Sequence, residues 1–269
     1  MSDKPSFPMP GTAYHASHPF YARAMGILKG AGIDFCVGGA YAVAFHCGIE
    51  RDTKDLDVMV RPEDCPRILD LFEREGYSTE LTHAHWLGKI FSDDHFVDVI
   101  FGSGNGLCPV DDLWFRHAPK GHLLDNETLI CPAEELIWSK SYIMERERFD
   151  GADVVHLIRA RGGEMDWRRL LDRFGRHWTP LLMHLLAYRF VYPSEIDRVP
   201  AWVLRELLGR VERGQEAELA RGEKVCCGTL ISLSQYQIDI EQWGHRDGRL
   251  HPTGNLTQEE ITRWVDSFR

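Results

Sequence analysis

The sequence predicts an α+β protein, in which a mixed β-sheet core flanked by helices is followed by a mainly helical C-terminal domain. Short apolar runs alternate with helical patterns up to about residue 101, as in folds that combine strands and helices. From about residue 131 onward, apolar residues recur mainly at helical spacing. The length of 269 residues exceeds what one small core needs and suits one large domain or two moderate ones, of which we expect two.

The proposed domain boundaries follow from these patterns and from the placement of proline. Four residues near the start disfavour helix: Pro5, Pro8, Pro10 and Gly11. Pro132, followed by two acidic residues, is typical of a helix start. We therefore expect a flexible N-terminal arm at residues 1–18, a core domain at 19–130 and a helical domain at 131–269.

In the core domain, each element is predicted from its period and its end signals. Pro19 and Pro62 suit the first turns of two helices, and Gly76 suits a helix end. Two apolar runs around Ser92-Asp93-Asp94 predict a hairpin. The expected order is helix 19–31, strand 33–37, helix 40–46, strand 55–60, helix 62–75 and hairpin strands 87–91 and 95–101.

In the C-terminal domain, apolar periodicity predicts a series of helices. After the helix that starts near residue 132, the expected helices are 154–160, 166–176 with Asp166 as cap, 180–190 and 200–213. Thr257-Gln258-Glu259-Glu260 is a capping box that predicts a last helix. Residues 228–243 have no clear period, which leaves an extended conformation open.

Composition indicates a soluble globular protein, with 43% hydrophobic and 27% charged residues. No apolar run approaches the roughly 18 to 20 residues that cross a bilayer, so we expect no membrane partner. The N-terminus lacks the apolar core of a signal peptide, and seven cysteines without framework spacing fit a reducing compartment. We therefore expect a cytoplasmic protein.

The formal net charge of −10 argues against a broad nucleic-acid-binding surface, which would need clustered basic residues. Between residues 140 and 178, however, basic side chains are frequent. We interpret them as solvated helix faces with internal ion pairs, and a local basic patch remains the alternative. They are Lys140, Arg146, Arg148, Arg159, Arg161, Arg168, Arg169, Arg173 and Arg176.

A pair of carboxylates and a pair of glycines form the main candidate site. Asp55 and Asp57 alternate with apolar residues in a predicted strand, so they point to the same side. Two adjacent carboxylates repel unless a cation lies between them, and hard oxygen ligands suit Mg²⁺. Gly38 and Gly39 lack Cβ atoms, and the helix that follows would direct its N–H groups at phosphate.

The run Val37-Gly38-Gly39, followed by residues 51–58 (RDTKDLDV), resembles the signature of the DNA polymerase β-like nucleotidyltransferase superfamily. The resemblance implies a nucleotidyltransferase core with a third carboxylate on a later strand, and Asp98 is the one charge in an apolar run. The alternative is an ordinary strand-to-helix turn at Gly38-Gly39 and a salt-bridged core residue at Asp98. It further implies that Asp55, Asp57 and Asp98 are the catalytic residues and hold two Mg²⁺ ions, for which Mn²⁺ can substitute. Gly38, Gly39 and Thr53 would bind the nucleotide.

Residues 139–153 resemble, more loosely, a later motif of the nucleotidyltransferase toxins of abortive-infection and toxin–antitoxin systems. This resemblance implies that Lys140 and Asp153 contact the nucleotide. The alternative for Lys140 is a side chain that extends to solvent. The first motif departs from many relatives, which have serine where this chain has Gly39, so phosphate would be held by backbone N–H groups alone.

Together with the resemblance, these features predict a metal-dependent nucleotidyltransferase; ATP binding is expected, and the preferred base stays open. It would transfer a nucleoside monophosphate from an NTP to a hydroxyl or similar acceptor on tRNA or other RNA, protein or a small molecule, and release pyrophosphate. The helical domain would close over the nucleotide, and the three aspartates would converge at a sheet edge beside the Gly38-Gly39 turn. One alternative is a nucleotide-binding regulatory protein or toxin–antitoxin partner without turnover. Another is a helical interaction protein with an accidental motif.

Overall fold

The computed structural model describes residues 17–220 and 222–266. Its chain forms two compact units that interleave along the sequence. The first unit contains residues up to Ser103 together with Pro109–Pro132, and the second contains Gly104–Cys108 together with residues from Ala133 onward. The expected arm at residues 1–18 lies outside the described residues apart from Ser17 and His18, and His18 begins the first helix.

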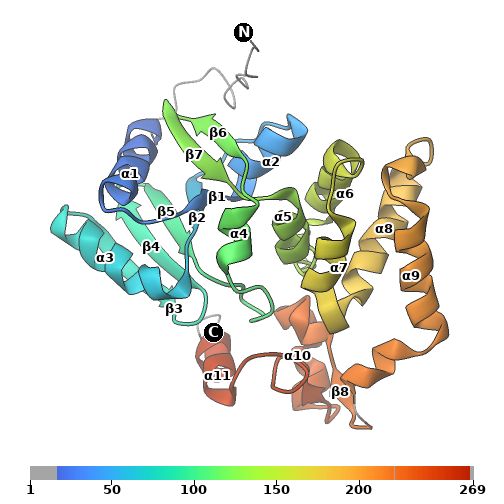
Figure 1. Ribbon diagram of the computed structural model, residues 1–269. Helices are drawn as coiled ribbons and strands as arrows, with labels where there is room; N and C mark the ends of the chain where they lie inside the picture. The colour runs from blue at the N-terminus through green and yellow to red at the C-terminus, as the bar shows by residue number, and fades with distance from the viewer. Residues whose placement is uncertain (1–16, 221, 267–269) are drawn as a thin grey trace. The chain divides into compact units, whose positions relative to one another are not determined.

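The first unit is built on a mixed sheet of seven strands (Figure 1). The spatial order is β3-β4-β5-β2-β1-β7-β6. The β2–β5 and β1–β7 pairs are parallel, and the other neighbours are antiparallel. The strands are β1 (Cys36–Val37), β2 (Asp55–Met59), β3 (Ser78–His83), β4 (Leu87–Ser92), β5 (His95–Ile100), β6 (Lys120–Leu123) and β7 (Asn126–Ile130).

Two helices of the first unit cover one face of this sheet. Leu69 of α3 packs on Gly88, which lies opposite Val99 in the β4–β5 register, so α3 covers the valine face. Tyr77 joins α3 to α1, because its ring lies 5.7 Å from that of Phe72 and 5.4 Å from that of Phe20. The helices of this unit are α1 (His18–Gly30), α2 (Gly39–Cys47), α3 (Cys65–Arg74) and α4 (Asp112–Arg116).

The second unit is mainly helical, with one two-stranded sheet. Asp166 caps α7 by accepting a hydrogen bond from the Arg169 N–H at 3.0 Å. Thr257 and Glu260 form the reciprocal bonds of the capping box before α11. Its helices are α5 (Ala133–Lys140), α6 (Gly151–Arg161), α7 (Trp167–Phe174), α8 (Thr179–Val191), α9 (Ala201–Glu212), α10 (Leu233–Glu241) and α11 (Gln258–Asp266), and its strands are β8 (Val225–Cys226) and β9 (Arg246–Asp247).

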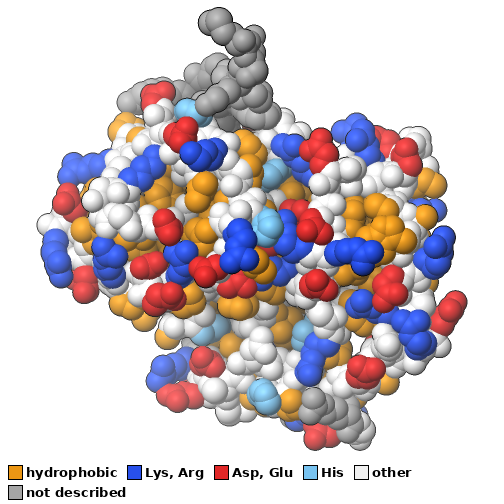
Figure 2. All heavy atoms as spheres, in the orientation of Figure 1, with side chains coloured by type: hydrophobic (Ala, Val, Ile, Leu, Met, Phe, Trp, Pro, Cys, Tyr) orange, Lys and Arg blue, Asp and Glu red, His pale blue; other side chains and the backbone are white. Residues whose placement is uncertain are grey.

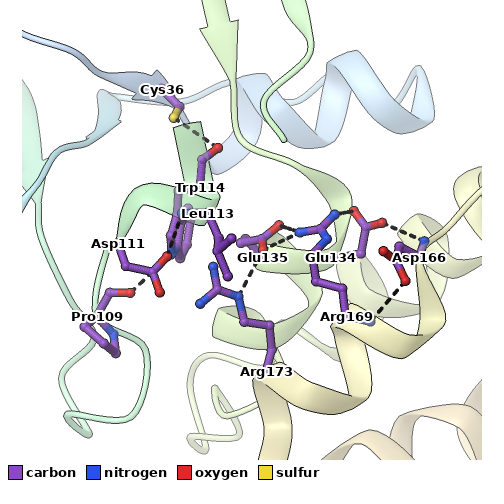
Figure 3. Close-up of polar contacts among 10 residues, drawn as sticks. All are labelled: Cys36, Pro109, Asp111, Leu113, Trp114, Glu134, Glu135, Asp166, Arg169 and Arg173. Carbon is purple, nitrogen blue, oxygen red and sulfur yellow. Dashed lines mark hydrogen bonds and ion pairs between the residues drawn. The ribbon is translucent and has the colours of Figure 1, made fainter. Parts of the chain in front are cut away.

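A buried ion-pair network joins α5 to α7 (Figure 3). The Glu135 side chain is fully buried and accepts hydrogen bonds from both Arg169 and Arg173, the latter at 3.1 Å. Arg169 also pairs with Glu134 at 2.8 Å. The Glu134 carboxylate in turn accepts from the Asp166 N–H at 2.8 Å. Arg169 and Arg173 therefore form ion pairs, as we expected of these basic residues, but their side chains are largely buried rather than solvated.

The predicted α+β class is confirmed, whereas several elements differ from their prediction. β3, β6, β7 and α4 were not predicted, because short, partly polar strands and a five-residue helix give little periodicity. Residues 233–241 form α10 rather than extended chain. Ser232 caps this helix by accepting from the Gln235 N–H, a local signal that our prediction did not use. Glu145 adds a long-range contact by accepting hydrogen bonds from Ser232 Oγ and the Leu233 N–H.

Surface charge and helix character relate to two expectations from composition, the lack of a broad basic surface and the lack of a membrane partner. Acidic and basic side chains are interspersed over the face shown in Figure 2. Among the described residues, none of the helices combines the length and the apolar character needed to span a membrane.

We predict that Glu135→Ala lowers the free energy of unfolding by about 3 kcal/mol or more. It removes a buried charge that is an ion-pair partner of two buried guanidinium groups. Urea denaturation followed by circular dichroism measures the loss. The control is Glu164→Ala, since the Glu164 side chain is 81% exposed and pairs only at the surface with Arg161. Equal losses in the two variants would contradict a structural role for the network.

Candidate active site

The pairing of β2 with β5 brings the three predicted carboxylates together. These strands are parallel, with Asp57 directly opposite Asp98 and Asp55 opposite Phe96. One carboxylate oxygen from each of Asp55, Asp57 and Asp98 lies within 4.8 Å of the others, and all three residues are half-buried. The alternating residues Leu56 and Val58 are fully buried on the opposite face. The same alternation therefore supplies both a core face and an acidic face.

The carboxylates lie in the middle of the sheet, so the prediction of a position at a sheet edge is wrong. β2 and β5 are neighbours, and each has a further strand on its other side. Strand alternation assigns a residue to a face but contains no information about strand order. The sequence could therefore predict the shared face and not the central position.

The Gly38-Gly39 turn lies directly against the acidic face. The Gly38 N–H donates to the Asp57 carbonyl at 2.9 Å, which ties the turn to β2. Gly39 starts α2 with φ of +52°, a conformation that favours glycine. A Cβ built on Gly39 would lie 1.6 Å from Asp57 Oδ2. The absence of a side chain thus lets the start of α2, the positive end of the helix dipole, approach this carboxylate.

Thr53 contacts the same cluster from the segment before β2. Its hydroxyl donates to Asp55 Oδ1 and lies 3.3 Å from the Asp55 carbonyl. A hydroxyl that donates to a carboxylate fixes the orientation of that carboxylate. The structure therefore gives Thr53 a direct role in orienting Asp55.

Two buried tyrosines lie near the cluster and remain neutral at physiological pH. Burial raises the pKa of Tyr41 to about 12, and the negative charge of Asp55 adds to the increase. The pKa of Tyr21 is raised further by burial, with smaller contributions from Asp55 and Asp57. Neither phenol is thus suited to accept a proton from an acceptor hydroxyl near pH 7.

Lys140 and Asp153, the other predicted nucleotide ligands, belong to the second unit and form an ion pair there. Lys140 Nζ lies 2.9 Å from Asp153 Oδ2 and 2.8 Å from Asp150 Oδ2, and all three side chains are largely buried. Burial alone would raise the pKa of Asp150, but the charges of Lys140 and Arg148 lower it below its usual value. The expected alternative of a Lys140 side chain extending to solvent does not hold.

Sequence reasoning did not identify Lys89 as part of the site. It lies opposite Asp98 in the antiparallel β4–β5 pair, and its Nζ is 2.6 Å from Asp98 Oδ1. Lys89 stands nine residues before Asp98, and the predicted hairpin already joined the two segments. Counting back through the hairpin register would have revealed the pair.

The donor chemistry of the cluster fits a divalent metal ion. Three carboxylate oxygens within 4.8 Å of one another are hard donors of the kind that bind Mg²⁺ or Mn²⁺. Among the described residues no other group of three or more His, Cys, Asp or Glu side chains is arranged in this way. In particular, His83, His85 and His95 do not form such a group.

The stretch that contains all three aspartates matches a known family model. Residues 22–99 match the model for aminoglycoside-2''-adenylyltransferase. They run from within α1 to within β5 and include the Gly38-Gly39 turn. No curated protein sequence matches the chain.

Several solved structures are similar to parts of the chain. The crystal structure of ANT(2'')-Ia in complex with adenylyl-2''-tobramycin is 13% identical, with a TM-score of 0.40 over 66% of this chain and 99% of that chain. The lincomycin-bound lincosamide antibiotic adenylyltransferase LnuA is 13% identical, with a TM-score of 0.38 over 53% and 96%. An antigenic nucleotidyltransferase-like protein from Paracoccidioides brasiliensis is 13% identical, with a TM-score of 0.42 over 68% and 94%.

We predict that Gly39→Ala destabilises the protein more than Gly48→Ala, by roughly 1–3 kcal/mol. Both glycines have positive φ, at opposite ends of α2, so both variants strain the backbone. Among the described residues no atom outside Gly48 and its chain neighbours lies within 4 Å of a Cβ built on Gly48, whereas a Cβ on Gly39 would meet the Asp57 carboxylate. Urea denaturation measures both losses.

The same measurement in an Asp57→Ala background tests the cause. Removing the Asp57 carboxylate leaves room for the new methyl group, so the excess loss at Gly39 should shrink. An excess of the same size in both backgrounds would show that Asp57 is not the obstacle.

Proposed function

We propose that this chain, a nucleotidyltransferase with a polymerase β-like core, transfers a nucleoside monophosphate from an NTP to a hydroxyl or similar acceptor and releases pyrophosphate. The observation that supports the proposal most directly is the cluster of Asp55, Asp57 and Asp98 beside the Gly38-Gly39 turn. Carboxylates that hold divalent cations, next to backbone N–H groups that can hold phosphate, are the parts that phosphoryl transfer requires.

Each candidate site residue in the first unit has a proposed role. Gly38 and Gly39 hold phosphate oxygens through backbone N–H groups at the start of α2, where a side chain at Gly39 would meet Asp57. Thr53 contacts the nucleotide, as the resemblance implies, and its hydroxyl also keeps the Asp55 carboxylate in one orientation. Asp57 and Asp98, opposite each other in the β2–β5 register, supply the remaining oxygen ligands.

The proposed cofactor is a pair of Mg²⁺ ions, with Mn²⁺ able to substitute, held by Asp55, Asp57 and Asp98. When bound, such ions neutralise triphosphate charge and lower the pKa of an acceptor hydroxyl. The residues present fit these metal ions, because every ligand atom of the cluster is a carboxylate oxygen.

The family match favours ATP as the donor and a small hydroxylated molecule as the acceptor, since that family model describes an adenylyltransferase of aminoglycosides. RNA, including tRNA, and protein hydroxyls are the other acceptor classes to test. The protein is incubated with Mg²⁺, a cell extract and each NTP labelled at the α-phosphate. Separation of RNA, protein and small molecules then shows which fraction acquires the label.

A nucleotide-binding regulatory protein without turnover, such as a toxin–antitoxin partner, is the second candidate. Such a protein would bind NTP with Mg²⁺ but would release no pyrophosphate. The presence of three clustered carboxylates favours the enzyme, because binding alone has little need for all of them.

We predict that Asp57→Asn lowers nucleotidyl transfer by roughly three decades or more, with little change in Tm. The substitution keeps the size of the side chain and removes a ligand charge, and each ~1.4 kcal/mol lost in the transition state costs tenfold in rate. Pyrophosphate release in the presence of acceptor extract measures the change.

Asp93→Asn is the matched control for this experiment. Asp93 is exposed in the turn between β4 and β5, and its φ of +51° is one that asparagine also adopts. This variant should retain wild-type transfer. Equal pyrophosphate release from wild type and Asp57→Asn would remove the case for catalysis at this cluster, and no release from wild type would favour the regulatory protein.

Contact of both Lys140 and Asp153 with the nucleotide is a further proposal from the sequence. We predict that Lys140→Met raises the KM for NTP, because a phosphate-neutralising charge is lost. Since the variant also leaves two buried carboxylates without this cation, its Tm is measured in parallel. An unchanged KM in folded protein would restrict Lys140 to its structural ion pair.

A further inference from the structure

Lys89 lies at the acidic cluster and is held there by two contacts. Its Nζ donates to Asp98 Oδ1 at 2.6 Å and lies 4.0 Å from the centroid of the Phe96 ring. Both partners are on β5, two residues apart and on the same face, while Lys89 comes from the neighbouring strand β4. The Lys89 side chain is only 21% exposed. A lysine usually extends its ammonium group into water, so the contact of the Lys89 ammonium with Asp98 and Phe96 departs from the usual placement.

The charges of the cluster give this lysine a consequence for metal binding. When ionised, the three carboxylates have a formal charge of −3, and the Lys89 ammonium places one positive charge at Asp98. A second divalent cation at Asp98 would meet the like charge of the Lys89 ammonium. The triphosphate of an NTP supplies the negative charge that offsets both the second cation and the Lys89 ammonium.

We propose that Lys89 is an internal counter-ion of Asp98 that competes with metal for this carboxylate until nucleotide arrives. The inference rests on the proposed function, because it assumes that the cluster binds divalent metal. Lys89 thereby weakens metal binding to the nucleotide-free protein and makes metal and nucleotide binding cooperative. Lys89 acts through Asp98 and is a positioning residue.

The test is a Mn²⁺ titration of nucleotide-free protein by isothermal calorimetry, with free Mn²⁺ checked by electron paramagnetic resonance. Lys89→Met keeps an unbranched apolar side chain for the Phe96 contact and removes the charge. It should bind Mn²⁺ about fivefold or more tightly than wild type, a change typical of coupled ligands. Lys89→Arg retains the charge and should bind Mn²⁺ with wild-type affinity.

Lys120→Met is the control for removing any lysine from the same sheet. Lys120 lies on the edge strand β6, is 74% exposed at its side chain and pairs with Glu127. It should leave Mn²⁺ affinity unchanged. Equal tightening in Lys120→Met and Lys89→Met would reduce the effect to net charge and would overturn the proposal.

A stability measurement supplies a second readout. In EDTA, Lys89→Met should melt below wild type, because the carboxylates lose a counter-ion, and added Mn²⁺ should raise its Tm more than that of wild type. If Lys89→Met does not fold, Lys89→Gln, which keeps a hydrogen-bond donor for Asp98, replaces it. If folded Lys89→Met or Lys89→Gln binds Mn²⁺ with wild-type affinity, the proposed role of Lys89 is overturned but the metal site is not. Failure of both wild type and variant to bind Mn²⁺ would overturn the metal site as well.

Discussion

The parallel register of β2 and β5 is the constraint on which the candidate site depends. It places Asp57 opposite Asp98, and carboxylates at such separations repel by roughly 1–4 kcal/mol per pair in a partly exposed setting. The opposite side of the same strands offsets this cost, because four apolar side chains are fully buried there: Leu56, Val58, Val97 and Val99. Burial of each such side chain stabilises the fold by about 1.5–3 kcal/mol. The acidic face thus exists because the apolar face fixes the register, and a slip of one residue would exchange the two faces.

Much of the candidate site could be predicted from the sequence, because its main features are local. Alternation assigns Asp55 and Asp57 to one face, and a lone charge in an apolar run identifies Asp98. Lys89 and the contact between Gly39 and Asp57 were not predicted, since they arise from pairing between strands and from backbone conformation. The departure from serine at Gly39 has a physical reason in the structure, because the positive φ and the adjacent carboxylate both exclude a side chain.

The fold was predictable where periods are long and end signals are strong. Helices such as α3, α7, α8 and α9 have apolar stripes with proline, aspartate or glycine at their ends, and these helices were predicted within a few residues. β6 and β7 alternate too briefly to stand out, and the start of α10 combines a local Ser232 cap with hydrogen bonds to Glu145, about ninety residues away in the chain. The burial of the pairs that Glu135 forms with Arg169 and Arg173 was likewise not predicted, because charges in a sequence indicate solvated faces until tertiary contacts assign them buried partners.

The segment Gly104–Cys108 belongs to the second unit although it directly follows the strand of Asp98. It is fixed there by Asn105, whose buried amide donates to the Leu230 carbonyl at 2.9 Å, and by Asn255, which donates to the Gly106 carbonyl at 3.1 Å. Neither unit is therefore encoded by one continuous stretch of the gene. A recombination event that exchanged only the part from Ala133 onward would leave this pentapeptide behind and deprive the incoming helices of its two asparagine contacts. During synthesis, likewise, the pentapeptide leaves the ribosome long before Leu230 and Asn255, so the second unit can be completed only after nearly the whole chain has emerged.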